Sequence, residues 1–393
     1  MQGLLNPTLA GIVILLAGCL DSSPAATPTP ADGSEDTNGA VGGSPPASGT
    51  PPQASTVATQ TVCFGGNFTR NVPYVAVVMT GTLFRPQNLT DQTRAIVLVH
   101  GFASTGAFTF DGGPAGFGVA NQTTLSRVLA SAGYAVFTMD RLGMGNNPYP
   151  DGRKLTIQSY VELTGDLVAQ IKAGTYHTST AACPSDGPAP FKAASVVVGG
   201  HSFGALIAQN YFQTSDEADG LLSLDLVHAL SETTVAAWSD CLARANQVDP
   251  APGYWASACT REYCLQIFFN VPGFDAASVE LLCDPARQIP DSQGSLTDVH
   301  YHVATMSERL LRGGPVFLLY AECAGSFNTP PCDPKAREKE TQSWENMCPS
   351  CTVREHVLPG VAHFYMLYPA ANTEANRVVL EWLAASGLAP TVV

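Results

Sequence analysis

Basic residues are scarce in this sequence, and their scarcity excludes one large class of partners. The chain has 393 residues, with 19 Lys and Arg against 33 Asp and Glu, so its formal net charge is −14. Binding to nucleic acid depends on clustered positive charge, and we therefore expect no DNA or RNA partner. Charged residues make up only 13% of the chain and hydrophobic residues 45%, a balance that fits a globular protein with few charges.

Long hydrophobic runs are also missing from the interior of the sequence. No internal stretch of about 20 uncharged apolar residues occurs, which excludes a protein that crosses a membrane several times. No internal repeat is present either. The length allows one large domain or two of ordinary size.

The N-terminus carries the one hydrophobic run that resembles an export signal. Residues Leu4–Ala17 are apolar apart from two positions, although no Lys or Arg precedes them, and we assign residues 1–18 to a signal peptide. The run ends in Leu16–Cys19, which resembles the bacterial lipobox, in which the cysteine becomes the lipid-modified first residue. This resemblance implies lipid attachment at Cys19, export, and anchoring to a bacterial membrane or cell surface. A plain signal peptide with an incidental cysteine, and hence a secreted protein, is the alternative.

The segment after Cys19 has no aromatic residue up to about Gln60. It is rich in Pro, Ala, Gly, Ser and Thr, and cannot bury enough apolar surface to offset the entropy lost on ordering. We therefore predict a lipid-anchored disordered linker over residues 19–60 and a folded domain over residues 61–393.

From about residue 61 onward, predicted strands and helices alternate. The strands are predicted at Val75–Phe84, Ala95–Val99, Tyr134–Met139, Ser195–Val198, Leu222–Leu230, Pro315–Tyr320 and Thr352–Leu358. The helices are predicted at Thr123–Ala132, Thr156–Ala173, Phe203–Gln213 and Thr373–Ala385. This alternation indicates an α/β fold with a mostly parallel central sheet flanked by helices, and functional residues at the carboxyl ends of its strands.

One long segment, at about residues 231–302, interrupts the alternation. It is too long for a simple loop and contains many aromatic residues and four cysteines, at positions 241, 259, 264 and 283. We predict a disulfide-rich cap insertion. Without Cys19, ten cysteines remain, an even number that suits disulfides in an exported protein, although the spacing does not define the pairing. A zinc site at Cys348 and Cys351 is the rival interpretation.

The clearest chemical motif is Gly200-His201-Ser202-Phe203-Gly204. It follows the strand Ser195–Val198 and precedes the apolar run Ala205–Ala208. A G-x-S-x-G sequence in that context is typical of a sharp strand-to-helix turn that presents a nucleophilic serine beside a helix N-terminus.

Other segments occur in the order found in one family. His100–Phe102 follows a strand and resembles the oxyanion loop of α/β hydrolases, Asp140–Asn146 is similar to their D-x-x-G-x-G-x-S turn, and His356–Phe364 is similar to their final strand and histidine loop. Together these segments, over roughly residues 70 to 390, resemble the α/β-hydrolase superfamily, with esterases and lipases as the implied members.

The resemblance implies a Ser-His-acid triad with an oxyanion hole. It assigns Ser202 as the nucleophile, His363 as the general base, and the backbone N–H groups of Phe102 and Phe203 as oxyanion donors. The acid is harder to place, because Ala324 occupies the position where the family usually has Asp. We expect Glu322 to serve instead, with Glu232 as the competitor and a site without any acid as the third possibility.

These assignments predict a serine hydrolase that cleaves an ester, with an apolar acyl or aryl substrate suggested by the aromatic cap. Amidase, thioesterase and peptidase chemistry use the same triad and stay open. The alternative is a catalytically silent surface lipoprotein that uses the fold as a binding module. We expect no cofactor, no metal site (the pair His300 and His302 lacks a third ligand nearby) and a monomer.

Overall fold

A computed structural model describes a single folded unit of the chain. The described residues are 57–67, 76–102, 104–111, 124–179, 187, 189–227, 252–256, 261–269, 271–274, 283, 290–292, 294, 313–324 and 334–390. All of them lie in the unit that spans Gln53–Val393. The predicted signal peptide, Cys19 and nearly all of the predicted linker lie outside the described residues.

The centre of this unit is a nine-stranded sheet with the order β11-β10-β7-β6-β3-β4-β2-β1-β5. Its parallel part consists of β3 (Arg94–Val99), β4 (Ala135–Met139), β6 (Ser195–His201), β7 (Gly220–Leu224), β10 (Gly314–Ala321) and β11 (Cys351–Leu358). Three strands at one side are antiparallel: β1 (Ala58–Asn67), β2 (Ala76–Arg85) and β5 (His177–Ser179). The mostly parallel sheet expected from the sequence is thus confirmed.

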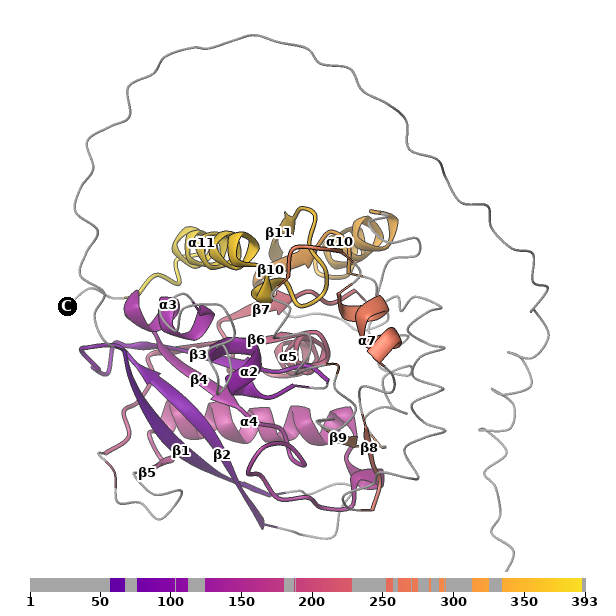
Figure 1. The fold of residues 1–393 in the computed structure, drawn as a ribbon. Coiled ribbons are helices and arrows are strands. Elements are labelled where there is room, and N and C mark those ends of the chain that lie inside the picture. Colours follow the sequence, from indigo (N-terminus) through magenta and orange to yellow (C-terminus); the bar gives the residue numbers. More distant parts are fainter. Residues whose placement is uncertain are drawn as a thin grey trace, which may run out of the picture. The chain divides into compact units, whose positions relative to one another are not determined.

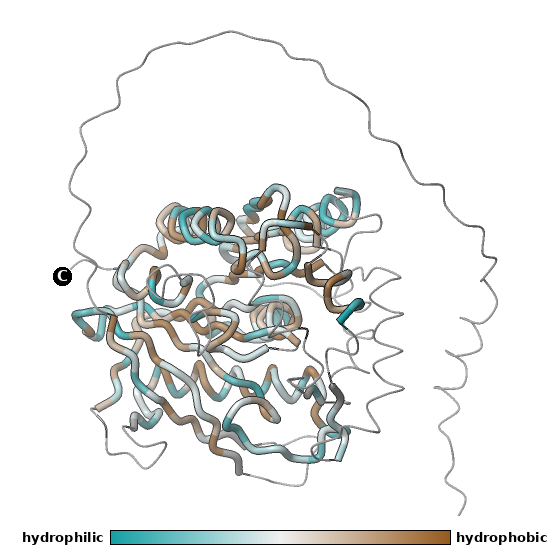
Figure 2. Tube along the Cα trace, viewed as in Figure 1, coloured by the Kyte–Doolittle hydropathy of each residue, from teal (hydrophilic) through white to brown (hydrophobic). Residues whose placement is uncertain are grey.

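The middle strands are buried on both faces, because helices cover the sheet from two sides. Every residue of β4 and β7 is buried, and so is β3 after its first residue. α4 (Ile157–Ala173) packs against α5 (Phe203–Thr214), and α3 (Leu125–Ser131) packs against α11 (Pro369–Ala385). Figure 1 shows these two helix pairs in the ribbon, and Figure 2 shows that hydrophobic and hydrophilic residues alternate along α4, as a helix half-buried on a sheet requires.

Local sequence signals set the ends of the longer helices. The Thr156 side chain accepts a hydrogen bond from the Ser159 amide, and the Ser159 hydroxyl accepts one from the Thr156 amide, which forms a capping box at the start of α4. Gly174 ends this helix in the left-handed conformation, with φ of 66°. α11 begins at Pro369, earlier than the sequence predicts, because proline fits the first helical turn, where its missing N–H is not needed.

Several elements differ from the sequence-based expectation. β1 begins at Ala58, inside the predicted linker, because its segment pairs along its whole length with β2. α2 (Gly106–Asp111) and α10 (Lys335–Met347) were not predicted. β7 ends at Leu224, whereas the sequence predicts a strand that continues to Leu230, and this shorter strand determines the position of Asp225.

The insertion is described only in pieces. They include β8 (Tyr254–Ala256) and β9 (Pro290–Ser292), which pair antiparallel, and α7 (Arg261–Phe268). A disulfide joins Cys264 to Cys283, so the prediction of disulfides in the insertion is confirmed. Cys348 and Cys351 form a second disulfide with each other, which agrees with the disulfide interpretation of this pair rather than the zinc interpretation.

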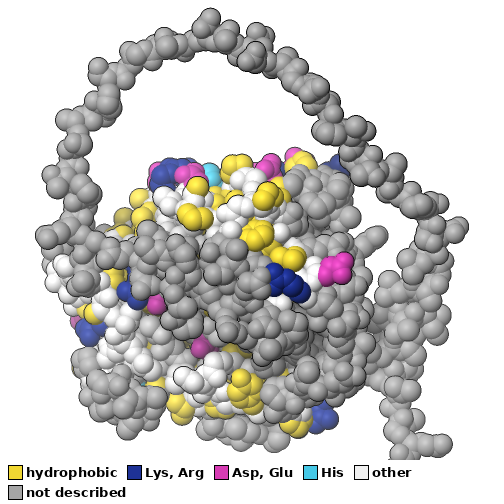
Figure 3. Space-filling view, viewed as in Figure 1, with side chains coloured by type: hydrophobic (Ala, Val, Ile, Leu, Met, Phe, Trp, Pro, Cys, Tyr) yellow, Lys and Arg dark blue, Asp and Glu magenta, His cyan; other side chains and the backbone are white. Residues whose placement is uncertain are grey.

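The placement of charged side chains and the character of the described helices agree with the low charge content and with the lack of long apolar runs inside the sequence. Among the described residues on the face drawn in Figure 3, the side chains of Lys, Arg, Asp and Glu lie at several separate places. Among the described helices, none has both the length and the apolar character needed to cross a membrane.

The central strands should carry much of the stability of the fold. Leu98 on β3 is completely buried, so Leu98→Ala is expected to lower the free energy of unfolding by about 2–5 kcal/mol through lost burial and the cavity left behind. Val78 on β2 is 54% exposed, and Val78→Ala is the matched control, with a change within about 0.5 kcal/mol. Chemical denaturation of both variants checks this, and equal losses would contradict the assigned core.

Candidate active site

Ser202 is the single residue between the end of β6 and the start of α5, and its backbone conformation is rare for serine. Its φ is 57° and its ψ is −123°. Such values are unfavourable for a residue with a Cβ and persist only where the surroundings enforce them, which is typical of functional positions. Among the described non-glycine residues, only Ser202 and Asp225 have positive φ. The sharp strand-to-helix turn predicted from the G-x-S-x-G motif is therefore present.

The two glycines of the motif are required by close packing. A Cβ on Gly204 would lie 1.9 Å from the carbonyl oxygen of Val99, and a Cβ on Gly200 would lie 2.3 Å from the carbonyl carbon of Gly204. Any other residue would push α5 away from β3 and β6. A Cβ on Gly101 would lie 2.9 Å from the Cβ of Ser202, so the loop that begins at His100 passes directly beside the serine.

His363 follows β11 and is paired with a carboxylate. Its Nδ1 lies 2.6 Å from Oδ2 of Asp225, and both side chains are 1% exposed. Asp225 directly follows β7, with φ of 49°, and its amide donates to the Leu319 carbonyl at 2.6 Å. The other carboxylate oxygen of Asp225 accepts a hydrogen bond from the Ala321 amide at 2.7 Å. Since a carboxylate accepts, His363 donates through Nδ1, and its Nε2 is left as the basic nitrogen.

Asp225 and the serine come from neighbouring strand ends. The Ser202 amide donates to the carbonyl of Leu224, the residue before Asp225, at 2.9 Å. The ring centroids of His201 and His363 lie 4.6 Å apart. The structure thus gathers the predicted Ser202 and His363 in one region, with Asp225 as their neighbour.

The acid expected from the sequence is not the one that contacts His363. The Glu322 carboxylate accepts a hydrogen bond from the Gly360 amide at 2.8 Å, and the Glu322 amide donates to the Leu358 carbonyl. Glu322 therefore braces the loop that carries His363 instead of pairing with the imidazole, and its assignment as the carboxylate partner of His363 is wrong. The competitor, Glu232, lies outside the described residues.

One signal in the sequence pointed to Asp225. It is the only charged residue in the apolar segment Leu221–Val227, and an unpaired carboxylate inside a buried strand would be costly. Because β7 ends at Leu224, Asp225 occupies the carboxyl end of its strand, where functional residues of parallel sheets lie.

His201 supports His363 through the backbone. It is completely buried, and its Nε2 donates to the carbonyl oxygen of His363 at 3.0 Å. His201, Asp225 and His363 offer possible ligand atoms within 4.8 Å of one another, a geometry that three metal ligands could adopt. Each of the three side chains already has a partner within the protein, because His363 Nδ1 pairs with Asp225 and His201 Nε2 bonds to the His363 carbonyl. His300 and His302 lie outside the described residues.

Burial controls the charge of these groups. It lowers the pKa of His363 to about 3, and burial together with the neighbouring His363 lowers the pKa of His201 to about 3. Burial raises the pKa of Asp225 to about 7, opposed by His201 and by the Ala321 amide. At neutral pH both imidazoles are therefore uncharged.

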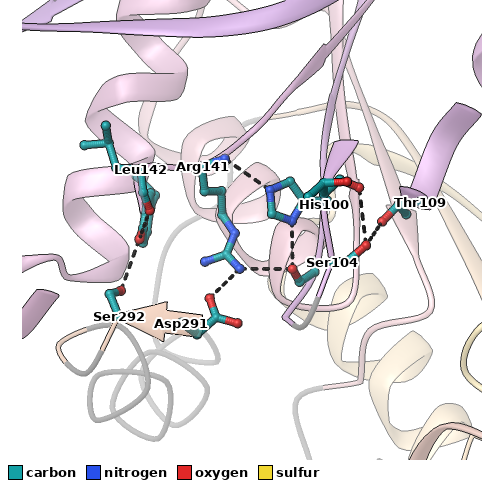
Figure 4. A network of polar contacts seen from close by, with 10 residues as sticks. His100, Ser104, Thr109, Arg141, Leu142, Asp291 and Ser292 are labelled. Atoms are coloured by element: carbon teal, nitrogen blue, oxygen red, sulfur yellow. Dashed lines mark hydrogen bonds and ion pairs between the residues drawn. The ribbon is translucent and has the colours of Figure 1, made fainter. Parts of the chain in front are cut away.

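The predicted oxyanion loop is held by a buried polar network, drawn in Figure 4. The Gly101 carbonyl accepts hydrogen bonds from Nη2 of Arg141 at 3.0 Å and from Nδ1 of His100 at 2.9 Å. The Phe102 and Phe203 rings stack with their centroids 4.1 Å apart, so the two predicted oxyanion residues are neighbours. The nearby carboxylate of Asp140 accepts from the Gly106 amide at 2.7 Å and fixes the start of α2.

Aromatic residues surround the imidazole of His363. Phe268 of α7 stacks on it with the ring centroids 5.7 Å apart, and the centroid of the Phe364 ring lies 5.6 Å from that of the imidazole. Phe269 stacks on Phe364 at 5.8 Å. The insertion thus contributes apolar surface directly to the site.

The fold and the site together define the class of protein. Residues 96–375 match the model of the alpha/beta hydrolase family, well over half of the chain, and the protein belongs to this family. No curated protein matches the sequence significantly.

Solved structures of similar fold include lipases and an esterase. A monoacylglycerol lipase of Paleococcus ferrophilus is 17% identical, with a TM-score of 0.53, and the match covers 78% of this chain and 99% of that one. A monoglyceride lipase of Saccharomyces cerevisiae, solved with a substrate analogue, is also 17% identical, with a TM-score of 0.54 and coverage of 88% and 100%. A thermophilic esterase of Thermogutta terrifontis is 12% identical, with a TM-score of 0.54 and coverage of 83% and 99%.

The buried histidines should make the fold sensitive to acid. Burial holds the pKa of His100, His201 and His363 below the ordinary value, so between pH 7 and 5 the unfolded chain binds protons that the folded protein does not. Burial raises the pKa of three carboxyl groups, which acts in the opposite direction, strongly at Asp225 and less at Asp140 and Asp111. The three histidines outweigh them. The free energy of unfolding is therefore expected to fall as the pH falls from 7 to 5.

Urea denaturation at several pH values measures this dependence. His201→Gln removes one of the three histidines and should weaken the loss, whereas His177→Gln, at an exposed position, is the matched control. An identical loss in wild type and His201→Gln would show that this histidine is not kept neutral by burial.

Proposed function

We propose that this protein is a serine hydrolase that cleaves carboxylic esters through an acyl-enzyme. Ser202 is the nucleophile, His363 the general base and acid, and Asp225 the carboxylate that orients His363. The observation that carries the proposal is the buried contact between His363 Nδ1 and Asp225, beside a serine in a strained turn.

The chemistry requires each of these groups. His363 is uncharged at neutral pH, so its Nε2 can take the proton of the Ser202 hydroxyl while the serine oxygen attacks the ester carbonyl. The electron pair of the carbonyl bond moves to oxygen, and the backbone N–H groups of Phe102 and Phe203 stabilise that oxyanion. The proton on His363 then passes to the departing alcohol, and water releases the acid by the same steps.

The Phe203 amide suits the role of oxyanion donor. Phe203 is the first residue of α5, and the first N–H groups of a helix have no partner inside the helix. The Gly101–Phe102 peptide passes beside Ser202, which brings the second donor close to the serine.

We infer an apolar acyl or aryl substrate from the aromatic residues around His363. Phe268 and Phe364 contact the imidazole, Phe269 stacks on Phe364, and ligand sites are usually apolar with a few polar groups. The similarity to a monoacylglycerol lipase and a monoglyceride lipase is consistent with a lipid ester. The chemistry of Ser202 and His363 also permits amide and thioester substrates.

We also propose export of the protein and anchoring to a membrane through Cys19. The disulfides Cys264–Cys283 and Cys348–Cys351 are of a kind that persists in oxidising compartments.

The alternative of a silent binding module arose from the alanine at position 324. Asp225 lies at His363 and can supply the carboxylate that position 324 lacks, so the alanine at position 324 no longer favours a silent binding module.

The role of Ser202 can be tested directly. A fluorophosphonate probe should label the wild-type protein covalently, because it reacts with activated serines, and Ser202→Ala should not be labelled. Mass spectrometry of the labelled peptide identifies the site. Equal labelling of both proteins would overturn the assignment.

The two candidate acids can be distinguished by a matched pair of variants. Asp225→Asn keeps the shape but reverses the preferred tautomer of His363, so kcat is expected to fall by about 10²–10⁴-fold. Glu322→Gln keeps an oxygen that can accept from the Gly360 amide, and kcat should stay within about tenfold. Hydrolysis of p-nitrophenyl butyrate measures both, and a larger loss in Glu322→Gln would reverse the assignment.

A further inference from the structure

One peptide unit connects the proposed oxyanion hole to the buried network around Arg141. The carbonyl of Gly101 and the N–H of Phe102 belong to the same planar trans peptide, so they point in opposite directions. Whatever holds the Gly101 carbonyl therefore also aims the Phe102 N–H. Two donors hold it, Nη2 of Arg141 and Nδ1 of His100.

Arg141 acts on this peptide twice. Its side chain donates directly to the Gly101 carbonyl, and its backbone N–H donates to Nε2 of His100 at 3.1 Å. Since a backbone N–H can only donate, Nε2 of His100 is unprotonated and the proton is on Nδ1, which faces Gly101. Burial, with Arg141 as a further cause, holds the pKa of His100 well below its ordinary value and keeps the ring neutral.

Arg141 itself is fixed by a residue of the insertion. Its Nη2 lies 2.6 Å from Oδ1 of Asp291 on β9, and both side chains are completely buried. Three rings surround the guanidinium group, with centroids 4.8–5.4 Å from its central carbon: Phe102, Tyr160 and Phe203. A buried cation is tolerated only with such a partner, so the position of Arg141 depends on Asp291.

The strands of the insertion fit closely at this point. A Cβ on Gly143 would lie 2.1 Å from the ring of Tyr254 on β8. The hydroxyls of Tyr160 and Ser292 lie 3.1 Å apart, and the Gly152 amide donates to the Pro252 carbonyl at 2.8 Å. Figure 4 shows Arg141 between His100 and Asp291. The packing of β8 and β9 on the domain thus fixes the position of the Asp291 carboxylate beside Arg141.

We propose that Arg141 is a positioning residue for the oxyanion hole and that Asp291 makes the insertion part of this positioning. The proposal rests on the proposed function, because it concerns the Phe102 N–H as an oxyanion donor. It predicts that the Arg141–Asp291 pair affects stabilisation of the transition state and leaves ground-state binding of the ester nearly unchanged.

The test compares four variants with the wild type. Arg141→Met removes the donor to Gly101, and Asp291→Asn removes the charge that holds Arg141. Ser292→Ala on the same strand removes the contact to Tyr160 and is the matched control. The double variant Arg141→Met with Asp291→Leu leaves neither charge of the pair buried without its partner. Circular dichroism and thermal unfolding establish which variants are folded.

The readouts separate positioning from stability. With p-nitrophenyl butyrate, kcat should fall about 10–100-fold in Arg141→Met and Asp291→Asn, with KM within about twofold. Affinity for a trifluoromethyl ketone, which forms a tetrahedral oxyanion on the serine, should fall by a similar factor. Ser292→Ala should resemble the wild type.

The double variant is decisive. If the ion pair serves stability alone, the double variant recovers wild-type kcat, and the proposal is overturned. If Arg141 positions the peptide, the double variant is as slow as Arg141→Met, although it is folded. Should Arg141→Met fail to fold, Asp291→Asn and the double variant carry the test.

Failure of this proposal differs from failure of the proposed function. A wild-type protein that a fluorophosphonate does not label refutes the serine hydrolase mechanism, and this proposal with it. A labelled wild type, together with folded Arg141 and Asp291 variants of unchanged kcat and ketone affinity, refutes only the positioning role.

Discussion

The hydrogen bond from the Ser202 amide to the Leu224 carbonyl joins the two strand ends from which the site is built. Both residues that follow these strands, Ser202 and Asp225, have positive φ, so the backbone turns sharply at the same edge of the sheet. Each turn is held by close contacts: glycines admit the helix beside Ser202, and Asp225 bonds through its amide and its carboxylate to β10. The strain at these positions is sustained by the packing of the parallel sheet.

His363 reaches this edge on a loop that is itself braced. Glu322 bonds to the Gly360 amide, the Cys323 amide donates to the Val361 carbonyl, and His201 donates to the carbonyl of His363. The imidazole therefore has a defined position before any substrate is present. This preorganisation suits the role of general base that we propose for His363, because a rearrangement during the reaction would add to the barrier.

The polar groups beneath the site form a second ordered layer. His100, Arg141 and Asp291 are completely buried, and their contacts connect the proposed oxyanion loop, the turn after β4 and the insertion. Burying such a network costs free energy unless its members satisfy one another. The insertion thus contributes both the apolar surface of Phe268 and the buried charge of Asp291.

Local sequence predicted the strands of the parallel sheet and the serine turn, because burial patterns and turn residues act over short distances. The family was predicted from the resemblance of an ordered set of motifs. Motifs next to predicted strand ends identified Ser202 and His363 as candidate site residues. Only the tertiary structure decided that Asp225 accompanies His363, since this depends on where β7 ends and on the order of strands in the sheet. The contact between Arg141 and Asp291 lies equally beyond local sequence, because it joins residues 150 positions apart that only the packing of β8 and β9 on the domain brings together.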